Sequence, residues 1–549
     1  MTTLTPEQRA LGRSNADEVL GQFNRRRFLQ AAAVAPAAGA FFFWREQKFN
    51  EPIRAAIIGT GNEGCGAMIH DSNPEYIKYI GVCDIRPSQR QRALDELRKH
   101  PGYSKEDVDA IEKNKLYANV DEMLADDDIE VVVIALPLWL HAPVAIKAMR
   151  AGKHVFCEKL MAHSIGECKA MCRVAHETNR FLAVGHQRHY STLYDNANFL
   201  VTEDLLGEIR HIRALWHRNN ACPRIKKDEN GNLVYNSQGE PEYLKDKDGN
   251  ILYFDGWKPE IPPEDADLDT SKLAVTLKNT KGREWTYKYD DVQQLVQWRL
   301  YDKTGAGLMA ELGSHQLDAC SIFLGKVHPI AVTGIGGTFF YEDGRQVDDH
   351  VFVTYEFPNE VDAKGLPVGK DRVVVTYSSI NTNAFENYGE CVYGSKATMI
   401  VEQERDLLLY KEIDRNTWKG GGGPRETKVS VEKKGDKPAL TTSPSLAGVA
   451  AAAVGGGGSD EAPSRGYREE LEHFAYCIRN NKNEKIYDVD DAKLLPRCRG
   501  QVALADAVIA LTSNLAMREK RRIDYDPAWF DFQDDSVPDK SEDDLELAV

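Results

Sequence analysis

A glycine-rich hexapeptide has the residue types and spacing that hold phosphate groups. It consists of Gly59, Thr60, Gly61, Asn62, Glu63 and Gly64, between an apolar run at residues 54–58 and a helical pattern near residue 67. In a strand–turn–helix unit the first glycine permits the tight turn. The second lets the backbone approach a pyrophosphate that rests on the helix N-terminus. We therefore expect these six residues to bind a dinucleotide.

An acidic residue after the next apolar run supports the same interpretation. Asp84 ends the run at residues 79–83, about 20 positions beyond the glycines, where an acid holds the adenosine ribose hydroxyls. A carboxylate there repels a 2′-phosphate, which favours NAD. Arg86 lies nearby and could stack on adenine or accept a phosphate, so NADP remains open.

Further apolar runs alternate with helical segments and predict the fold class. A strand buried on both faces of a parallel sheet is almost continuously apolar, and repeated β-α-β units place ligands at the carboxyl ends of the strands. We expect an α/β protein whose N-terminal domain is a doubly wound parallel sheet. The further strands are expected at residues 129–135, 154–157 and 181–185.

Four residues that could do chemistry follow two of these strands. Pro137 and His141 come after the strand at 129–135, and Glu158 and Lys159 come after the strand at 154–157. Because carboxyl ends of parallel strands meet at one edge, we expect all four beside the cofactor.

Composition excludes several classes of function. The chain has 549 residues, enough for two or three domains, and a formal net charge of -16. That charge argues against nucleic acid, which needs clustered Lys and Arg. Ten cysteines are spread thinly. Cys168 and Cys172 share a helix face, but no second His or Cys pair completes a zinc set. We expect no metal site and no disulfide framework.

The first 45 residues are interpreted as a twin-arginine signal. Arg25, Arg26 and Arg27 precede Phe28-Leu29, and an Ala-rich apolar stretch runs to residue 44. The stretch is too short for a membrane span of about 20 residues, and this order of segments is typical of export signals. We expect a periplasmic or otherwise exported protein. Cleavage near Ala38-Gly39-Ala40 and retention as an anchor both remain open, and a basic amphipathic helix is the alternative.

Four segments in order resemble one known family. The segments GTGNEG, ALPLWLHAPVA, CEKL and GAGLMAELGSHQLD together resemble the glucose–fructose oxidoreductase, inositol dehydrogenase and MocA family (Gfo/Idh/MocA), from about residue 53 to 524. The resemblance implies a Rossmann domain at 50–186. It also implies a C-terminal α/β domain at 187–525, whose open, mostly antiparallel sheet often makes the oligomer contact. The expected substrates are sugars, cyclitols or their relatives.

The resemblance also assigns catalytic positions. The family's Glu-Lys-Pro motif corresponds to Glu158-Lys159, with Leu160 in place of proline. Its later motif, an acid followed four positions on by histidine, corresponds to Glu311 and His315, where many members have aspartate instead of Glu311. Both departures affect how the reactive groups are presented.

Those residues suit hydride transfer from a secondary alcohol, which requires removal of the hydroxyl proton. Lys159 is the first candidate for general acid/base, and His315 the second, because its ordinary pKa lies near working pH. Glu311 shares a helix face with His315 and could orient the imidazole or hold a hydroxyl. Further substrate contacts are expected from Asp318, Trp298, Arg299 and Gln187.

Three segments depart from the family frame. An insertion at 217–297 repeats a motif, KDENGNLVYN and then KDKDGNILYF, which predicts hairpins in a lid, an oligomer contact or a surface decoration. Residues 420–465 hold two GGGG runs and predict a flexible loop. The acidic tail at 526–549 is expected to fray.

We expect an exported NAD(P)-dependent oxidoreductase, in an oligomer of two or four chains, with a tightly bound cofactor that recycles. The alternatives are a glycosidase that oxidises its substrate transiently with NAD, and a non-catalytic sugar or NAD sensor. The Gly-His-Tyr-Pro stretch associated with NAD-dependent glycosidases is absent from the sequence.

Overall fold

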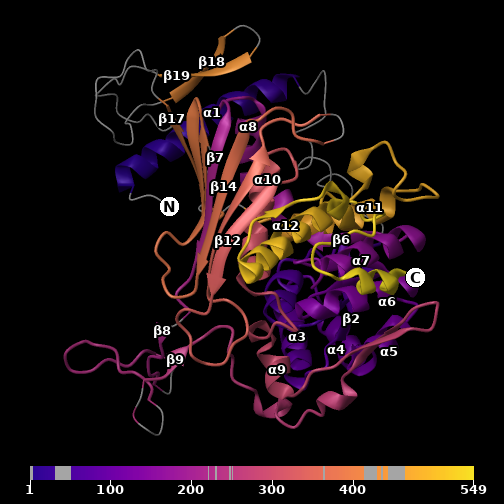
Figure 1. Ribbon diagram of the computed structural model, residues 1–549. Helices are drawn as coiled ribbons and strands as arrows, with labels where there is room; N and C mark the ends of the chain where they lie inside the picture. The colour runs from indigo at the N-terminus through magenta and orange to yellow at the C-terminus, as the bar shows by residue number, and fades with distance from the viewer. Residues whose placement is uncertain are drawn as a thin grey trace.

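The computed structural model shows two sheets with helices packed between and around them (Figure 1). It describes residues 4–30, 51–220, 222–228, 232–245, 249, 251–362, 365–412, 429–434, 437–442 and 464–549.

The first sheet is the predicted doubly wound Rossmann sheet. Its strand order is β3-β2-β1-β4-β5-β6, and every neighbouring pair is parallel. The strands are β1 (Ile53–Ile58), β2 (Ile77–Cys83), β3 (Leu116–Tyr117), β4 (Val131–Ile134), β5 (His154–Glu158) and β6 (Leu182–Gly185). The crossover helices are η1 (Gly64–Ile69), α3 (Pro87–Lys99), α4 (Lys105–Asn114), α5 (Val120–Leu124), α6 (His141–Arg150) and α7 (Ile165–Glu177).

The second sheet is open and mostly antiparallel, as expected. Its order is β17-β16-β15-β7-β14-β13-β12-β20, and only β7 and β14 pair in parallel. The strands are β7 (Ile209–His217), β12 (Ala331–Gly337), β13 (His350–Pro358), β14 (Arg372–Ile380), β15 (Tyr388–Gly394), β16 (Ala397–Glu402), β17 (Asp406–Lys411) and β20 (Ile523–Asp524). The helices α8 (Thr192–Thr202), α10 (Ser314–Phe323) and α12 (Gly500–Glu519) pack on it. They share one apolar core with the inward-facing residues of the sheet.

Two late helices complete the cores. α11 (Tyr467–Asn480) buries Leu471 and Phe474 against the Rossmann sheet. Among the described helices, α12 alone has the length and hydropathy of a membrane span, and 78% of its apolar window is buried inside the protein. That burial is typical of the core helix of a globular domain.

The N-terminal segment is partly integrated into the second domain. Helix α1 (Pro6–Gln30) packs along β17 and buries Ala16 and Val19. Arg13 forms an ion pair of 2.8 Å with Asp406, and Asn15 Nδ2 donates to the Leu409 carbonyl over 3.0 Å. The apolar part of the expected signal, 31–44, lies outside the described residues.

The insertion forms the predicted hairpins. Lys227 bridges Leu233, and Lys245 bridges Ile251, around the two repeated turns. Strands β8 (Cys222–Pro223) and β9 (Tyr253–Phe254) close the base of this arm, which projects from the second domain in Figure 1. The rest of the insertion, with β10 (Val275–Lys278), β11 (Glu284–Tyr287) and α9 (Val292–Val296), lies against the Rossmann domain.

The predicted loop at 420–465 contains a hairpin within its described part. Strands β18 (Val429–Lys434) and β19 (Lys437–Thr442) pair in antiparallel. The prediction of flexibility stays a prediction for the parts of this segment that lie outside the described residues, which are 413–428, 435–436 and 443–463.

The prediction of a frayed acidic tail was wrong. Helix η11 (Glu542–Ala548) packs on α7 and buries Leu547 completely. Asp539 Oδ2 accepts a bond of 3.0 Å from the backbone N–H of Ile165. Asp544 Oδ2 accepts one of 2.6 Å from the Ser164 hydroxyl. Negative charge is stabilising at a helix N-terminus, so the tail's acidic residues act as a cap for α7.

Leu547→Ala should therefore destabilise the fold, although it lies three residues from the end of the chain. A buried Leu→Ala change costs about 2–5 kcal/mol through lost burial and the cavity left behind. Urea denaturation followed by tryptophan fluorescence measures the loss. Leu366→Ala, at a position 42% exposed, is the matched control. Equal midpoints for the two variants would contradict a docked tail.

Candidate active site

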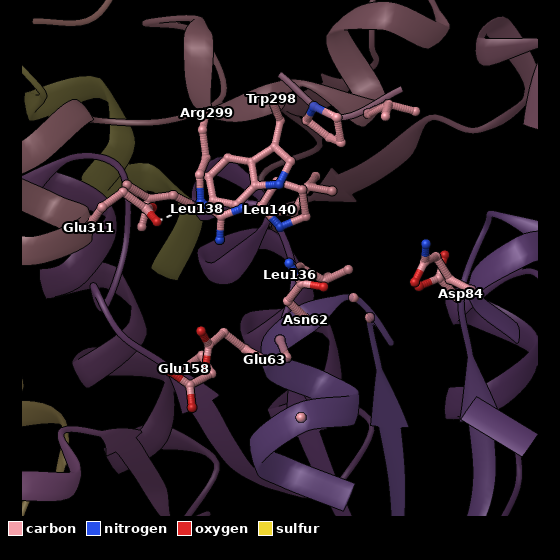
Figure 2. Close-up of a pocket in the computed structure, with 18 of the residues that line it drawn as sticks. Asn62, Glu63, Asp84, Leu136, Leu138, Leu140, Glu158, Trp298, Arg299 and Glu311 are labelled. Atoms are coloured by element: carbon pink, nitrogen blue, oxygen red, sulfur yellow. Dashed lines mark hydrogen bonds and ion pairs between the residues drawn. The ribbon is translucent and has the colours of Figure 1, made fainter. Parts of the chain in front are cut away.

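A cleft of about 840 Å³ lies where the two domains meet (Figure 2). It brings together most residues singled out from the sequence. Of the residues singled out from the sequence, those that line the cleft are Gly59, Gly61, Asn62, Glu63, Asp84, Arg86, Pro137, His141, Glu158, Lys159, Trp298, Arg299, Glu311 and His315.

The glycine-rich turn has the shape that a dinucleotide needs. Gly59 has φ +86°, and a Cβ there would meet the Ala135 carbonyl oxygen at 2.4 Å. A Cβ on Gly64 would lie 2.1 Å from the Gly59 carbonyl oxygen. Gly61 has no neighbouring atom within 4 Å of a built Cβ, so its backbone is open to a phosphate. Gly59 and Gly64 shape the turn, while Gly61 faces the cleft.

Asp84 is held at the end of β2 in the position expected for ribose binding. Its Oδ2 accepts a bond of 2.8 Å from the Thr60 backbone N–H, and its Oδ1 accepts one of 2.8 Å from the Arg86 backbone N–H. Thr60 itself is fully buried and acts through Asp84. The described residues of this end of the cleft fit a dinucleotide.

Lys159 projects from the end of β5 toward the second domain. Its Nζ donates to the Glu311 backbone carbonyl over 2.8 Å, and the Lys159–Leu160 peptide bond is cis. The buried His141 ring lies 2.8 Å from the Leu160 carbonyl and 2.9 Å from the Leu136 carbonyl. Burial lowers the pKa of His141, so the neutral ring donates to one of these carbonyls and braces the turn after Lys159.

Glu311 begins a polar chain along the upper wall in Figure 2. Its Oε2 accepts a bond of 2.7 Å from Arg299 Nε, and the Arg299 guanidinium lies 4.3 Å from the centre of the Trp298 ring. Burial raises the pKa of Glu311, but Arg299 and Lys159 outweigh it and hold the pKa below its usual value. The side chain is therefore a carboxylate that orients Arg299. It accepts no hydrogen bond from His315 within the described structure.

His315 faces the cleft beside an aromatic wall. Its ring centre lies 5.5 Å from that of Trp216. Burial, together with the positive charges of Lys159 and Arg188, lowers the pKa of His315 well below its ordinary value. The imidazole is neutral at working pH and can exchange a hydrogen bond with a hydroxyl.

Arg188 fixes the position of His315 from the side of that residue that faces the protein interior. Its Nη1 donates to the His315 backbone carbonyl over 2.7 Å and to Glu390 over 2.7 Å, and its Nη2 lies 2.9 Å from Glu404. The guanidinium is almost fully buried. Arg188 thereby ties the end of the Rossmann domain to α10 and to the second sheet.

Glu158 forms part of the floor of the cleft. Burial, and then the nearby Glu63 carboxylate, raise the pKa of Glu158 to about 8. Its Oε2 accepts a weak bond of 3.2 Å from the Lys159 backbone N–H. The raised pKa favours the protonated form of Glu158, and within the described structure the Lys159 Nζ bonds to the Glu311 carbonyl and forms no ion pair with Glu158.

Two residues expected to bind substrate lie outside the cleft. Gln187 is 1% exposed and does not line the cleft. Asp318 is also 1% exposed and is paired with Lys326 at 2.7 Å and with His189 at 2.9 Å. It lies three positions after His315, and the helical rotation between them turns Asp318 toward the protein interior.

Asp318 belongs to a buried ionic cluster behind the cleft. Donor atoms of His189, Asp318 and Asp506 lie within 4.8 Å of one another, as do those of His186, Cys498 and Asp506. The sequence pointed to no metal site because these residues come from separate segments. In the described structure the Lys326 ammonium already supplies positive charge to the first group.

Several residues of the cleft were missed by sequence reasoning. Trp216 lies near the end of β7 and Arg218 follows that strand, and the Arg218 guanidinium lies 5.0 Å from the Trp216 indole. Trp257 comes from the insertion, while Arg465 and Tyr467 join the cleft just before and at the start of α11. The aromatic–basic pair at the end of a strand was a usable signal. Arg465 lies in the segment that was predicted to be a flexible loop, and no sequence pattern marked it as a cleft residue.

Comparison with known proteins agrees with this geometry. Residues 53–186 match the NAD-binding Rossmann fold of the Gfo/Idh/MocA oxidoreductase family, and residues 280–399 match the Gfo/Idh/MocA C-terminal domain. A glycosyl hydrolase family 109 protein of Shewanella baltica is 25% identical over 212 residues, which are 38% of this chain and 44% of that protein. An inositol 2-dehydrogenase of Salmonella paratyphi B is 27% identical over 176 residues, 32% of this chain and 48% of that protein. The chain thus spans less than half the length of these curated relatives.

A solved structure extends the likeness to both domains. The inositol dehydrogenase homolog of Azotobacter vinelandii, complexed with NADH and myo-inositol, aligns with 87% of this chain and 99% of its own. The TM-score is 0.53 at 15% identity, which is a likeness of fold. Both family models match in order, so residues 53–186 form an NAD-binding Rossmann domain of the Gfo/Idh/MocA oxidoreductase type and residues 280–399 match the C-terminal domain of that family.

Proposed function

We propose that this protein transfers hydride between bound NAD and a secondary hydroxyl carbon of a sugar, cyclitol or glycoside. The observation that carries the proposal is the placement of Lys159. Its amine meets the α10 side of the cleft at Glu311, and the glycine-rich turn lines the same cleft. A group that can transfer a proton and a turn that can bind a dinucleotide therefore line the same cleft.

The chain's own residues handle the proton. When the alcohol is oxidised, its C–H electron pair leaves as hydride, and the O–H pair becomes the second bond of the carbonyl. The hydroxyl proton passes to the Lys159 side chain after that side chain has given up its own proton, with the His315 imidazole as the neighbouring acceptor. The bound nicotinamide supplies the hydride acceptor. Reduction reverses each transfer.

The walls of the cleft suit a polyhydroxylated ring. Trp216 and Trp298 offer apolar faces, and Arg218 and Arg299 offer hydrogen-bond donors beside them. Aromatic faces can pack against the C–H groups of a sugar ring, and the fixed donors can form hydrogen bonds with its hydroxyls. Small-molecule sites usually combine apolar walls with a few polar groups in this way. The substrates named for two relatives, inositol and myo-inositol, support this class.

Transient oxidation of a glycoside is the second candidate. The family 109 glycosyl hydrolase name of one relative favours it. In that reaction the substrate would first be oxidised, then lose its leaving group by elimination and add water, and finally be reduced by the reverse proton and hydride transfers. Lys159 and His315 both line the cleft, which weighs against a third alternative, a non-catalytic sensor.

The exposed face of the second sheet supports a homo-oligomer. Ile335 pairs across the sheet with Phe352, and both are exposed, at 68% and 46%. Phe385, 68% exposed, and Val374, 36% exposed, add to the exposed apolar residues of this sheet and its loops. Apolar patches of this kind mark protein–protein contacts, so we propose a dimer or tetramer formed through this sheet.

Export remains a proposal drawn from Arg25 to Leu29. If the twin-arginine route carries the folded protein to the periplasm, NAD would travel inside it and recycle there between two substrates.

Lys159→Ala should lower kcat/KM for the best sugar or cyclitol by about 10²–10⁴-fold, the range for loss of a general acid/base. NAD binding, measured by fluorescence titration, should stay within a few-fold of the parent chain. Lys303→Ala, at a lysine that pairs with Asp290 at the surface, is the control. Unchanged turnover in Lys159→Ala would contradict the proposed chemistry.

Product analysis separates the two catalytic candidates. With polyols and free sugars, the oxidoreductase should yield a carbonyl product and one NADH per turnover. With aryl glycosides, the glycosidase would release the free phenol and sugar with no net change in NADH absorbance. Phenol release that depends on NAD, in the absence of any carbonyl product, would overturn the first candidate in favour of the second.

Replacing Arg25 and Arg26 together with lysine should keep the protein in the cytoplasm of a host that has the twin-arginine system. Cell fractionation and immunoblotting measure the distribution. Replacing Arg9, in the part of α1 that pairs with Glu402, is the comparison, and its export should persist. An unaltered periplasmic fraction for the double variant would argue against this route.

A further inference from the structure

Arg86, the residue that left NADP open, is already engaged by an acid from the insertion. Its Nε donates to Asp265 Oδ2 over 2.8 Å. The Asp265 side chain is fully buried and that of Arg86 is 16% exposed. The two residues are 179 positions apart, so the contact joins the insertion to the adenosine end of the cleft.

Asp265 also caps helix α3. Its Oδ1 accepts a bond of 3.2 Å from the Ser88 backbone N–H, and its Oδ2 accepts one of 2.5 Å from the Ser88 hydroxyl. The residue at the N-cap position of α3, Arg86, supplies no side-chain cap of its own. A carboxylate at a helix N-terminus is stabilised by the exposed N–H groups and the helix dipole. Three donors therefore hold one buried carboxylate in place.

The surrounding part of the insertion, residues 255–297, is fastened along the Rossmann domain; we term it the strap. Tyr289 is 3% exposed, and its ring packs edge-on against Trp139 with centres 5.1 Å apart. Lys147 Nζ donates to the Thr276 carbonyl over 2.9 Å, and Leu277 is buried in the Rossmann core. In Figure 1 the strap, with α9, runs along the Rossmann domain near α3.

The strap also forms a wall of the cleft, opposite the residues that would hold the cofactor. The cleft is bounded on one side by the glycine-rich turn, Asp84 and Arg86. The strap residues that line it are Gly256, Trp257, Pro259, Glu260, Pro262, Leu273, Val275, Tyr289, Leu295 and Val296. A dinucleotide seated on the turn would lie between these two sides.

We propose that the strap retains the cofactor and that Asp265 is a specificity-determining residue that selects NAD(H) over NADP(H). This inference rests on the proposed function. Arg86 donates its backbone N–H to Asp84, the expected ribose ligand, while its guanidinium is neutralised by Asp265. A 2′-phosphate at this position meets two carboxylates and no free cation from Arg86, and like charges at short range repel.

Two substitutions separate retention from specificity. Asp265→Asn keeps the shape of the side chain and removes its charge, so Arg86 becomes available to a phosphate. Arg86→Ala breaks the same contact from the other side and leaves no guanidinium. Asp267→Asn, at an exposed acid two positions along the strap, is the matched control. Circular dichroism and the thermal midpoint establish that each full-length variant is folded.

The first measurement is the rate at which pre-bound NADH leaves the full-length protein, followed by fluorescence after mixing with an excess of NAD⁺. We expect release at least tenfold faster in both Asp265→Asn and Arg86→Ala than in the parent chain and Asp267→Asn. The second is the ratio of Kd values for NADP⁺ and NAD⁺. That ratio should fall at least tenfold in Asp265→Asn and not in Arg86→Ala.

The outcomes distinguish this inference from the function on which it rests. If folded Asp265→Asn releases NADH at the parent rate and has an unchanged Kd ratio, the roles proposed for the strap and for Asp265 are wrong. The proposed hydride transfer would be unaffected by that result. A gain of NADP⁺ affinity in Arg86→Ala as well would overturn the role assigned to the guanidinium. If Asp265→Asn does not fold, Arg86→Ala with parent-like release overturns retention. A parent chain that binds neither nucleotide contradicts the proposed function too.

Discussion

The structure depends on one buried guanidinium. Arg188 leaves the Rossmann domain just after β6 and enters the second domain, where it meets Glu390 and Glu404 and the carbonyl of His315. A charge taken out of water is costly unless ion pairs and hydrogen bonds replace the lost hydration. Pulling Arg188 away from the second sheet would leave this buried guanidinium without Glu390 and Glu404. The same contact that joins the domains therefore holds His315 at the cleft.

The cleft uses this rigid junction to combine two kinds of chemistry. Parallel strands bring backbone amides and Asp84 to the cofactor side, whereas the helical segment 309–323, which ends with α10, brings Glu311 and His315 to the other side. Lys159 bridges the two, because it leaves a strand of the first domain and bonds to a carbonyl of the second. The proposed proton and hydride transfers need groups held on both sides of one carbon, and the two-domain arrangement offers such groups.

Segments that look peripheral in the sequence complete the structure. The acidic tail caps α7, and the strap caps α3 through Asp265. In each case a carboxylate from a distant segment satisfies N–H groups that a helix leaves unpaired at its start. The tail contributes mainly to stability, while the strap also bounds the cofactor site. Both are held by burial as well as charge, through Leu547 for the tail and Leu277 for the strap.

Features that depend on neighbouring residues were determined by the sequence alone. The glycine-rich turn, Lys159 at the end of a strand and the two repeated hairpins follow from local spacing and backbone preference. The family resemblance then placed Glu311 and His315 correctly in one cleft. Substrate identity was not determined, because it depends on the combined shape of walls drawn from both domains.

Only the tertiary structure decided the remaining features. Asp318 has the right residue type and helical spacing, but Lys326 and His189 hold it in the interior. Asp265 carries no motif, yet it meets Arg86 across 179 positions. The tail has the composition of a frayed end and is docked by a few buried apolar groups. Long-range pairs such as these form because burial makes an unpaired charge costly, and the spacing of residues along one chain does not reveal which distant partner will satisfy it.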